Sequence, residues 1–164
     1  MLQPLCRRTW APRGETPIQR AWDRHDRLSA IGAITVSPQR RRLGFFFRVH
    51  GHNIRAPDIV SFLCQLHRHV RRPIIVVWDR SSVHRSAAKQ LARCKWLKVE
   101  WLPAYAPKLN PVEAAWSHTK YSDLANYVPN DVDELYDEVG NSLNDLHFTQ
   151  TLLRSFFRWA GLEL

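Results

Sequence analysis

The feature that most constrains the fold is Ile74–Trp78, a run of five apolar residues followed directly by Asp79. A short continuous apolar run of this kind is typical of a strand buried on both faces. An acid at the end of such a strand is either a turn residue or a catalytic one. Open α/β sheets collect their reactive groups at the carboxyl ends of parallel strands, so Asp79 is a candidate site residue.

The patterns around this run predict a mixed α/β fold. Alternating apolar residues predict strands at 28–36, 43–50 and 97–103, the first two forming an antiparallel hairpin through a turn at 38–42. Helical periodicity and capping residues predict helices at 56–70, 86–93, 111–124, from about 130, and at 152–160. Because a helix joins strand 74–78 to strand 97–103, we expect these two strands to be parallel in a mixed sheet with helices on its faces.

Composition narrows the class of protein. The 164 residues suffice for one domain with a core, and 24 Lys+Arg against 15 Asp+Glu give a net charge of +9. This charge favours a polyanionic partner, nucleic acid before membrane, and no apolar run approaches the roughly 20 residues of a membrane span. Arg7 and Arg8 leave no room for the apolar part of a signal peptide. Cys6, Cys64 and Cys94 form no CxxC pair, so we expect reduced thiols and a cytoplasmic location.

A second acid, Glu113, is predicted at the same side of the sheet as Asp79. Strand 97–103 leads through a loop into the helix that Glu113 begins, and 113 − 79 = 34 positions hold one helix, one strand and a loop. Mg²⁺ prefers oxygen ligands, and two such ions about 3.5–4 Å apart promote phosphodiester cleavage. On a basic chain, the carboxylate pair indicates a metal-dependent nuclease or strand-transfer enzyme.

Structural roles for both acids remain open at this point. Glu113 is the third residue after Asn110, which is where a Glu closes a capping box, and its charge suits the positive end of the helix dipole. Asp79 is placed to cap a helix that begins after Ser81 or Ser82. Spacing alone does not decide between these roles and catalysis.

Two blocks resemble DDE-type transposases: "IVVWDRSSVHRS" and "VEWLPAYAPKLNPVEAAWSHTKY". The nearest resemblance is to the bacterial insertion-sequence branch of the mariner superfamily, whose pattern is an apolar strand, Asp-x-x-x-x-His, then LP-x-Y-x-P-x-LNP-x-E-x-x-W. The segments "RRTWAPRGETP", "RLSAIGAITV" and "NIRAPDIVSFL" are also similar, so the resemblance covers nearly the whole chain. The matching residues are Trp78, Asp79, His84, Leu102, Pro103, Tyr105, Pro107, Leu109, Asn110, Pro111, Glu113 and Trp116.

The resemblance implies an RNase H-like fold whose first strand is missing or incomplete here, and a single DDE endonuclease domain over 1–164 with a C-terminal helical extension at 125–164. It implies DNA cleavage and strand transfer with two Mg²⁺ or Mn²⁺ ions in the intact enzyme. The expected partners are double-stranded DNA, at transposon ends and target, and further copies of the chain in a homo-oligomer. Asp79 is then the second catalytic acid and Glu113 the third, and both ligate metal.

The first acid of the family precedes the segment that matches "LQPLCRRTW", and this chain begins at Met1, after that point. Asp23 and Asp26 lie in a charged loop and do not replace it. We therefore expect a C-terminal part of a transposase that is inactive or very weak alone. The alternative is a non-catalytic DNA-binding remnant that uses the basic face. A cellular RNase H-like nuclease is a third reading, against which the LNP-x-E-x-x-W block argues.

Several other residues are candidates for supporting roles. His84 would orient Asp79 or contact a phosphate, Asn110 caps the helix of Glu113, and Lys120 falls seven residues after Glu113 on the same helical face. Trp116 is interpreted as the packing residue that holds this helix on the sheet. Arg40, Arg41 and Arg42 lie in the hairpin turn, where contact with a DNA backbone and simple solvation are equally open.

Two histidine pairs, His50 with His52 and His67 with His69, have the composition of a metal site. Neither pair has a third ligand at zinc-like spacing in the sequence. They are therefore interpreted as solvated histidines.

Overall fold

The computed structural model describes residues 7–15, 28–40 and 42–163. Its first element is an antiparallel hairpin of β1 (Ser29–Val36) and β2 (Leu43–His50), in which Ser29 lies opposite His50 and Val36 opposite Leu43. The predicted turn is confirmed: the N–H of Arg40 donates to the carbonyl of Ser37 at 2.8 Å, and Arg40 adopts a positive φ of 54°. Arg41 lies outside the described residues.

The next four elements form a β-α-β unit with a helix before it: α1 (Ala56–Val70), β3 (Ile74–Trp78), α2 (Ser82–Leu91) and β4 (Leu97–Trp101). Strands β3 and β4 are parallel, as predicted, with Ile74 opposite Leu97 and Trp78 opposite Trp101. Helix α2 begins four residues before its predicted start, because the hydroxyl of Ser81 accepts the backbone N–H of His84 and caps the helix there.

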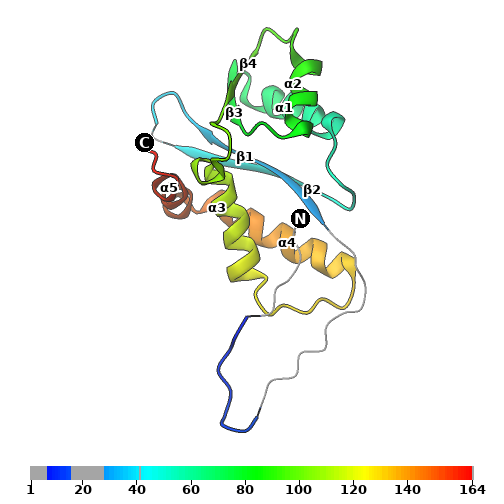
Figure 1. The fold of residues 1–164 in the computed structure, drawn as a ribbon, viewed down its shortest axis with the longest axis vertical. Helices are drawn as coiled ribbons and strands as arrows, with labels where there is room; N and C mark the ends of the chain where they lie inside the picture. Colours follow the sequence, from blue (N-terminus) through cyan, green and yellow to red (C-terminus); the bar gives the residue numbers. More distant parts are fainter. Residues whose placement is uncertain (1–6, 16–27, 41, 164) are drawn as a thin grey trace.

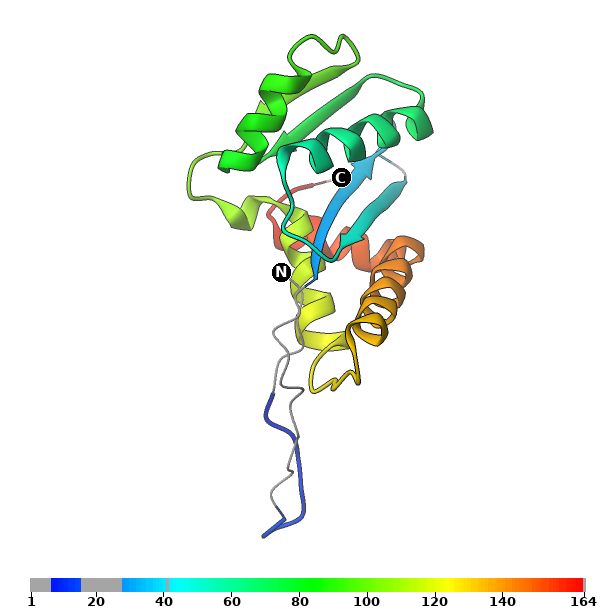
Figure 2. The same ribbon diagram turned by 90° about the vertical axis from the view of Figure 1, so that its right-hand side faces the viewer.

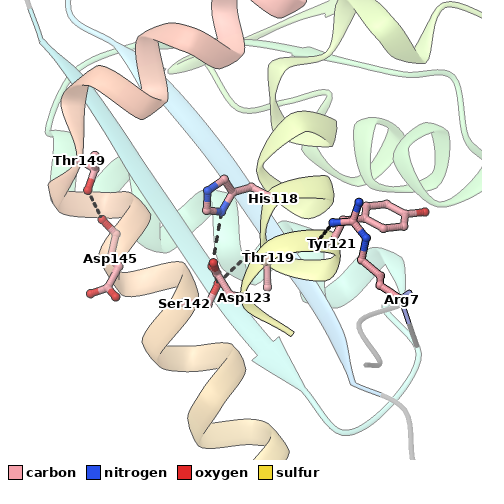
Figure 3. Close-up of polar contacts among 8 residues, drawn as sticks. All are labelled: Arg7, His118, Thr119, Tyr121, Asp123, Ser142, Asp145 and Thr149. Carbon is pink, nitrogen blue, oxygen red and sulfur yellow. Dashed lines mark hydrogen bonds and ion pairs between the residues drawn. The ribbon is translucent and has the colours of Figure 1, made fainter. Parts of the chain in front are cut away.

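The remaining elements are η1 (Pro107–Leu109), α3 (Pro111–His118), η2 (Thr119–Asp123), α4 (Val132–Phe148) and α5 (Gln150–Trp159). The predicted helix 111–124 is thus an eight-residue α-helix continued by a π-helical turn, η2. Figure 3 shows Thr119, Asp123 and Ser142 meeting between η2 and α4: the Ser142 hydroxyl lies 2.9 Å from Thr119 Oγ1 and 2.5 Å from Asp123 Oδ2. No described helix has the length and apolar character needed to cross a membrane.

The hairpin lies between α1, β3, α2 and β4 on one side and α3, α4 and α5 on the other (Figures 1 and 2). A hydrophobic cluster lies against each of its faces. Successive side chains of a strand point to opposite faces. Ala30, Ile34 and Phe45 therefore belong to a cluster with α3, α4 and α5, which we call cluster 1. Ile31, Ala33 and Phe46 pack against a cluster formed by α1, β3, α2 and β4, which we call cluster 2.

The expectation that β3 is buried on both faces is wrong. Ile75 and Val77 are 66% and 56% exposed, because α1 and α2 cover only the other face of this strand pair. On the open face their neighbours on β4 are Lys98 and Glu100, which form an ion pair at 2.8 Å. Within the described residues the four strands form two separate pairs and not one continuous sheet.

Candidate functional site

Asp79 directly follows β3 and is held by the start of α2. Its Oδ1 accepts the backbone N–H of Ser81 at 2.9 Å and lies 2.6 Å from Nδ1 of His84. The His84 ring stacks on Trp78, with centroids 4.8 Å apart and planes 11° from parallel. Ser81, and not Asp79, is the N-cap of α2, so the capping role left open for Asp79 is not the one observed.

Glu113 occupies the first turn of α3, where Asn110 is the N-cap. The Asn110 side chain accepts the N–H of Val112 at 3.2 Å, which confirms its predicted capping role. No capping box forms with Glu113, in contrast to the start of α1. Among the described residues no hydrogen bond or ion pair engages the half-buried Glu113 carboxylate, which is free to bind a cation.

The two carboxylates lie within each other's electrostatic field. Burial raises the pKa of Glu113, and the negative charge of Asp79 raises it further. Partial burial alone would raise the pKa of Asp79, but the Ser81 N–H and His84 outweigh it, so that this pKa is lowered. Asp79 therefore loses its proton first, and Glu113 ionises against an existing charge. A divalent cation between them would relieve that repulsion.

Trp116 holds α3 on the hairpin, as predicted. Its indole lies against Gly32 of β1 and meets the Phe45 ring edge-on at 6.1 Å. The half-buried side chain of Lys120 does not follow the ideal helical spacing from Glu113, because the π-helical turn intervenes. Its Nζ lies 5.6 Å from the ring centroid of Tyr121. Arg42 is exposed in the hairpin turn.

One cluster of potential ligands was missed by the sequence reading. His50, His52 and Asp58 each offer a ligand atom, and these atoms all lie within 4.8 Å of one another. Asp58 thus offers His50 and His52 a third potential ligand in space, although not at a zinc-like spacing in the sequence. The cluster was missed because its third member comes from a different element, the first turn of α1. It is the only such group of three found in the described part of the chain, so none includes Asp79 and Glu113.

Paired carboxylates at the carboxyl end of parallel strands, on a strongly basic α/β domain, are typical of metal-dependent enzymes that cleave phosphodiester bonds. The comparison with known families agrees. The chain belongs to the DDE superfamily endonucleases, whose family model matches residues 2–136. Members of this superfamily act on DNA and depend on divalent metal ions. No curated protein and no solved structure matches the chain.

Proposed function

We propose that this chain is the catalytic domain of a DDE-type transposase of the bacterial insertion-sequence branch, with Asp79 and Glu113 as two of its metal-binding acids. Residues 1–164 form one domain in this proposal, because α4 and α5 pack in cluster 1 with the hairpin and α3. The observation that carries the proposal is the match of the family model to residues 2–136, and it is supported by the raised pKa of Glu113, part of which is due to Asp79. Two acids that lie far apart in sequence thus share one electrostatic environment.

The donor chemistry fits a hard divalent cation such as Mg²⁺ or Mn²⁺. Carboxylate oxygens are the preferred ligands of these ions. The backbone N–H of Ser81 and Nδ1 of His84 both approach Oδ1 of Asp79, and the Glu113 carboxylate has no competing partner among the described residues. When bound, such ions activate the attacking water and stabilise the leaving oxygen in phosphodiester cleavage.

His84 has a positioning role in this proposal. Its ring is held by stacking on the buried Trp78, and its Nδ1 approaches Asp79 at 2.6 Å. The contact fixes the rotamer of Asp79 and keeps the carboxylate ionised, which is the form that binds metal. Replacement of His84 should therefore weaken metal binding less than replacement of either acid.

Metal binding is the direct test of the pair. Mn²⁺ is titrated into the purified chain and free Mn²⁺ is followed by electron paramagnetic resonance. We expect Asp79→Asn and Glu113→Gln each to weaken binding at least about tenfold, a loss of about 1.4 kcal/mol or more. Asp137→Asn removes an exposed carboxylate of α4 and serves as the matched control. Equal binding by all four proteins would exclude the proposed site.

Strand cleavage tests the catalytic part of the proposal. Plasmid DNA is incubated with the chain and Mg²⁺ or Mn²⁺, and nicked circles are resolved by electrophoresis. We expect little or no nicking by the chain alone, since the two-metal reaction needs more carboxylate ligands than Asp79 and Glu113 provide. Nicking that disappears in Asp79→Ala would instead show that the chain supplies a complete site.

The non-catalytic alternative rests on the net charge of +9. In that case DNA binding depends on phosphate contacts alone and is indifferent to Asp79 and Glu113. Each phosphate contact contributes about −0.9 to the slope of log affinity against log salt concentration. If Arg40 and Arg42 contact phosphates, their joint replacement by Ala should flatten the slope by about 2. DNA binding that is unchanged by metal and by Asp79→Asn would favour this alternative.

A further inference from the structure

A second group of potential metal ligands, outside the Asp79–Glu113 pair, consists of His50, His52 and Asp58. His50 is the last residue of β2, His52 lies two residues on in the connecting loop, and Asp58 lies in the first turn of α1. The loop thus folds back so that both histidines face the start of the helix. The His50 and His52 rings are 4.9 Å apart between centroids, and Nε2 of His52 lies 3.5 Å from Oδ2 of Asp58.

We propose that these three side chains form a second metal site, which binds one borderline divalent ion of the Zn²⁺ class with water as its fourth ligand. The site shares no residue with the Asp79–Glu113 pair and differs from it in chemistry. Two imidazoles and one carboxylate suit Zn²⁺, Co²⁺ or Ni²⁺, whereas Mg²⁺ prefers a set made of oxygen atoms.

The distances fit an ion better than a direct contact. A hydrogen bond between a ring nitrogen and a carboxylate is about 2.7–3.2 Å long, so the 3.5 Å between His52 and Asp58 is long for one. Zinc bonds of about 2.0–2.2 Å place neighbouring tetrahedral ligands about 3.3–3.6 Å apart, which includes the observed value. The outer limit of 4.8 Å for the whole group requires only small side-chain movements to close on an ion.

The surroundings of His50 and Asp58 favour metal binding by these side chains. Nε2 of His50 is shielded from solvent and has no hydrogen-bond partner, which leaves the ring without a competing contact at that atom. Asp58 is oriented by the backbone N–H of Arg55, which donates to Oδ2 at 2.8 Å. Hydrogen bonds that orient a ligand strengthen metal sites.

A metal ion at this site would bind where the chain passes from β2 to α1. The loop between His50 and Asp58 connects β2, whose Val49 lies in cluster 1, to α1, whose Ala56 lies in cluster 2. An ion bound by both ends of this loop would fix the helix relative to the hairpin. His52 is exposed, so the ion can enter from solvent.

The test measures Zn²⁺ binding by competition with a chromophoric chelator, in the presence of excess Mg²⁺. We expect one Zn²⁺ per chain at this site. Because the loss of a residue that merely supports a ligand typically costs 10–100-fold in affinity, loss of a ligand should cost at least about tenfold. His52→Ala removes an exposed ligand, and Asp58→Asn keeps an oxygen that can accept the Arg55 N–H while removing the charge. His69→Ala removes an exposed histidine outside the group and is the matched control.

The absorption spectrum of bound Co²⁺ gives an independent measure of the coordination geometry at this site. Tetrahedral Co²⁺ absorbs visible light far more strongly than octahedral Co²⁺, and the wild-type chain should show the tetrahedral spectrum, which His52→Ala should lose. Unchanged zinc affinity in Asp79→Asn would confirm that the two sites are separate. Equal zinc affinity in wild type, His52→Ala and Asp58→Asn, or an octahedral Co²⁺ spectrum, would overturn the proposal. Circular dichroism without metal verifies that each variant is folded.

Discussion

Gly32, in the middle of β1, leaves the space that the Trp116 indole occupies. A Cβ atom at this position would lie 2.6 Å from Cη2 and 2.8 Å from Cζ2 of Trp116, and 3.3 Å from Cε2 of Phe45. Carbon atoms pack best at about 3.5–4.0 Å, so Gly32→Ala requires the indole to move by about 1 Å. Trp116 and Glu113 are one turn apart on α3, so the displacement would reach the candidate metal ligand.

The energetic cost follows from two opposing contributions. Overpacking a filled core costs about 1–3 kcal/mol, and replacing Gly by Ala returns about 0.4–1 kcal/mol through the entropy of the unfolded chain. We therefore expect Gly32→Ala to reduce the free energy of unfolding by about 1–2 kcal/mol. Gly140→Ala is the matched control: a Cβ at Gly140 meets nothing within 4 Å, and Ala should stabilise α4 by about 0.5–1 kcal/mol.

Urea unfolding followed by circular dichroism gives both values. A double variant with Trp116→Phe removes the two indole atoms that clash, so the cost of Gly32→Ala should largely disappear in that background, as a double-mutant cycle would detect. Mn²⁺ affinity, measured on the same proteins, should fall in Gly32→Ala and not in Gly140→Ala. If Gly32→Ala were as stabilising as Gly140→Ala, the close packing of Trp116 on β1 would be refuted.

Three further outcomes are expected. The raised pKa of Glu113 means that its ionisation opposes folding, so the free energy of unfolding falls as pH rises through the glutamate range. Without metal, Glu113→Gln should therefore raise the free energy of unfolding at neutral pH but not at a pH where Glu113 is protonated. Urea titrations at both pH values measure this difference. His84→Ala should raise the pKa of Asp79, measured by NMR of the carboxyl carbon; an unchanged pKa would contradict the positioning role. Ser142→Ala should cost about 1–3 kcal/mol by leaving the buried Thr119 hydroxyl without its partner, whereas Ala at the exposed Ser117 should be neutral, and equal unfolding midpoints would argue against the network of η2 and α4.

Local sequence patterns predicted the elements well, because apolar periodicity and caps act over a few residues. The bounds of α1 and β3 were predicted as observed, and the parallel pairing of β3 with β4 followed from the helix between them. Periodicity predicted the start of α2 at Ser86. The observed start is the one weighed for a helix capped by Asp79, with Ser81 as the cap instead. Exposure of Ile75 depends on which elements cover a sheet face, and this is not encoded in the strand itself.

The two candidate metal sites show the same difference between local sequence signals and tertiary contacts. Asp79 and Glu113 could be proposed from sequence because strand ends and helix starts have recognisable signals. Asp58 was not linked to the two histidines, because it reads locally as a helix-capping acid, a role it also has: it accepts the N–H of Arg55. The Asp58 carboxylate thus has a local role, as a cap of α1, and a proposed tertiary role, as a partner of the two histidines. Only the tertiary role depends on the path of the loop.

The position of the hairpin explains how the candidate active site is held. Asp79 follows Trp78, which lies in cluster 2, whereas Glu113 belongs to α3, whose Ala114 and Ala115 lie in cluster 1. The hairpin separates these clusters and contacts both, so the distance between the two carboxylates is set by packing on its two faces. A substitution on either face of β1 should therefore alter metal affinity without touching a ligand. Changes that face cluster 1, such as Gly32→Ala, should move Glu113, and changes that face cluster 2, such as Ile31→Ala, should move Asp79.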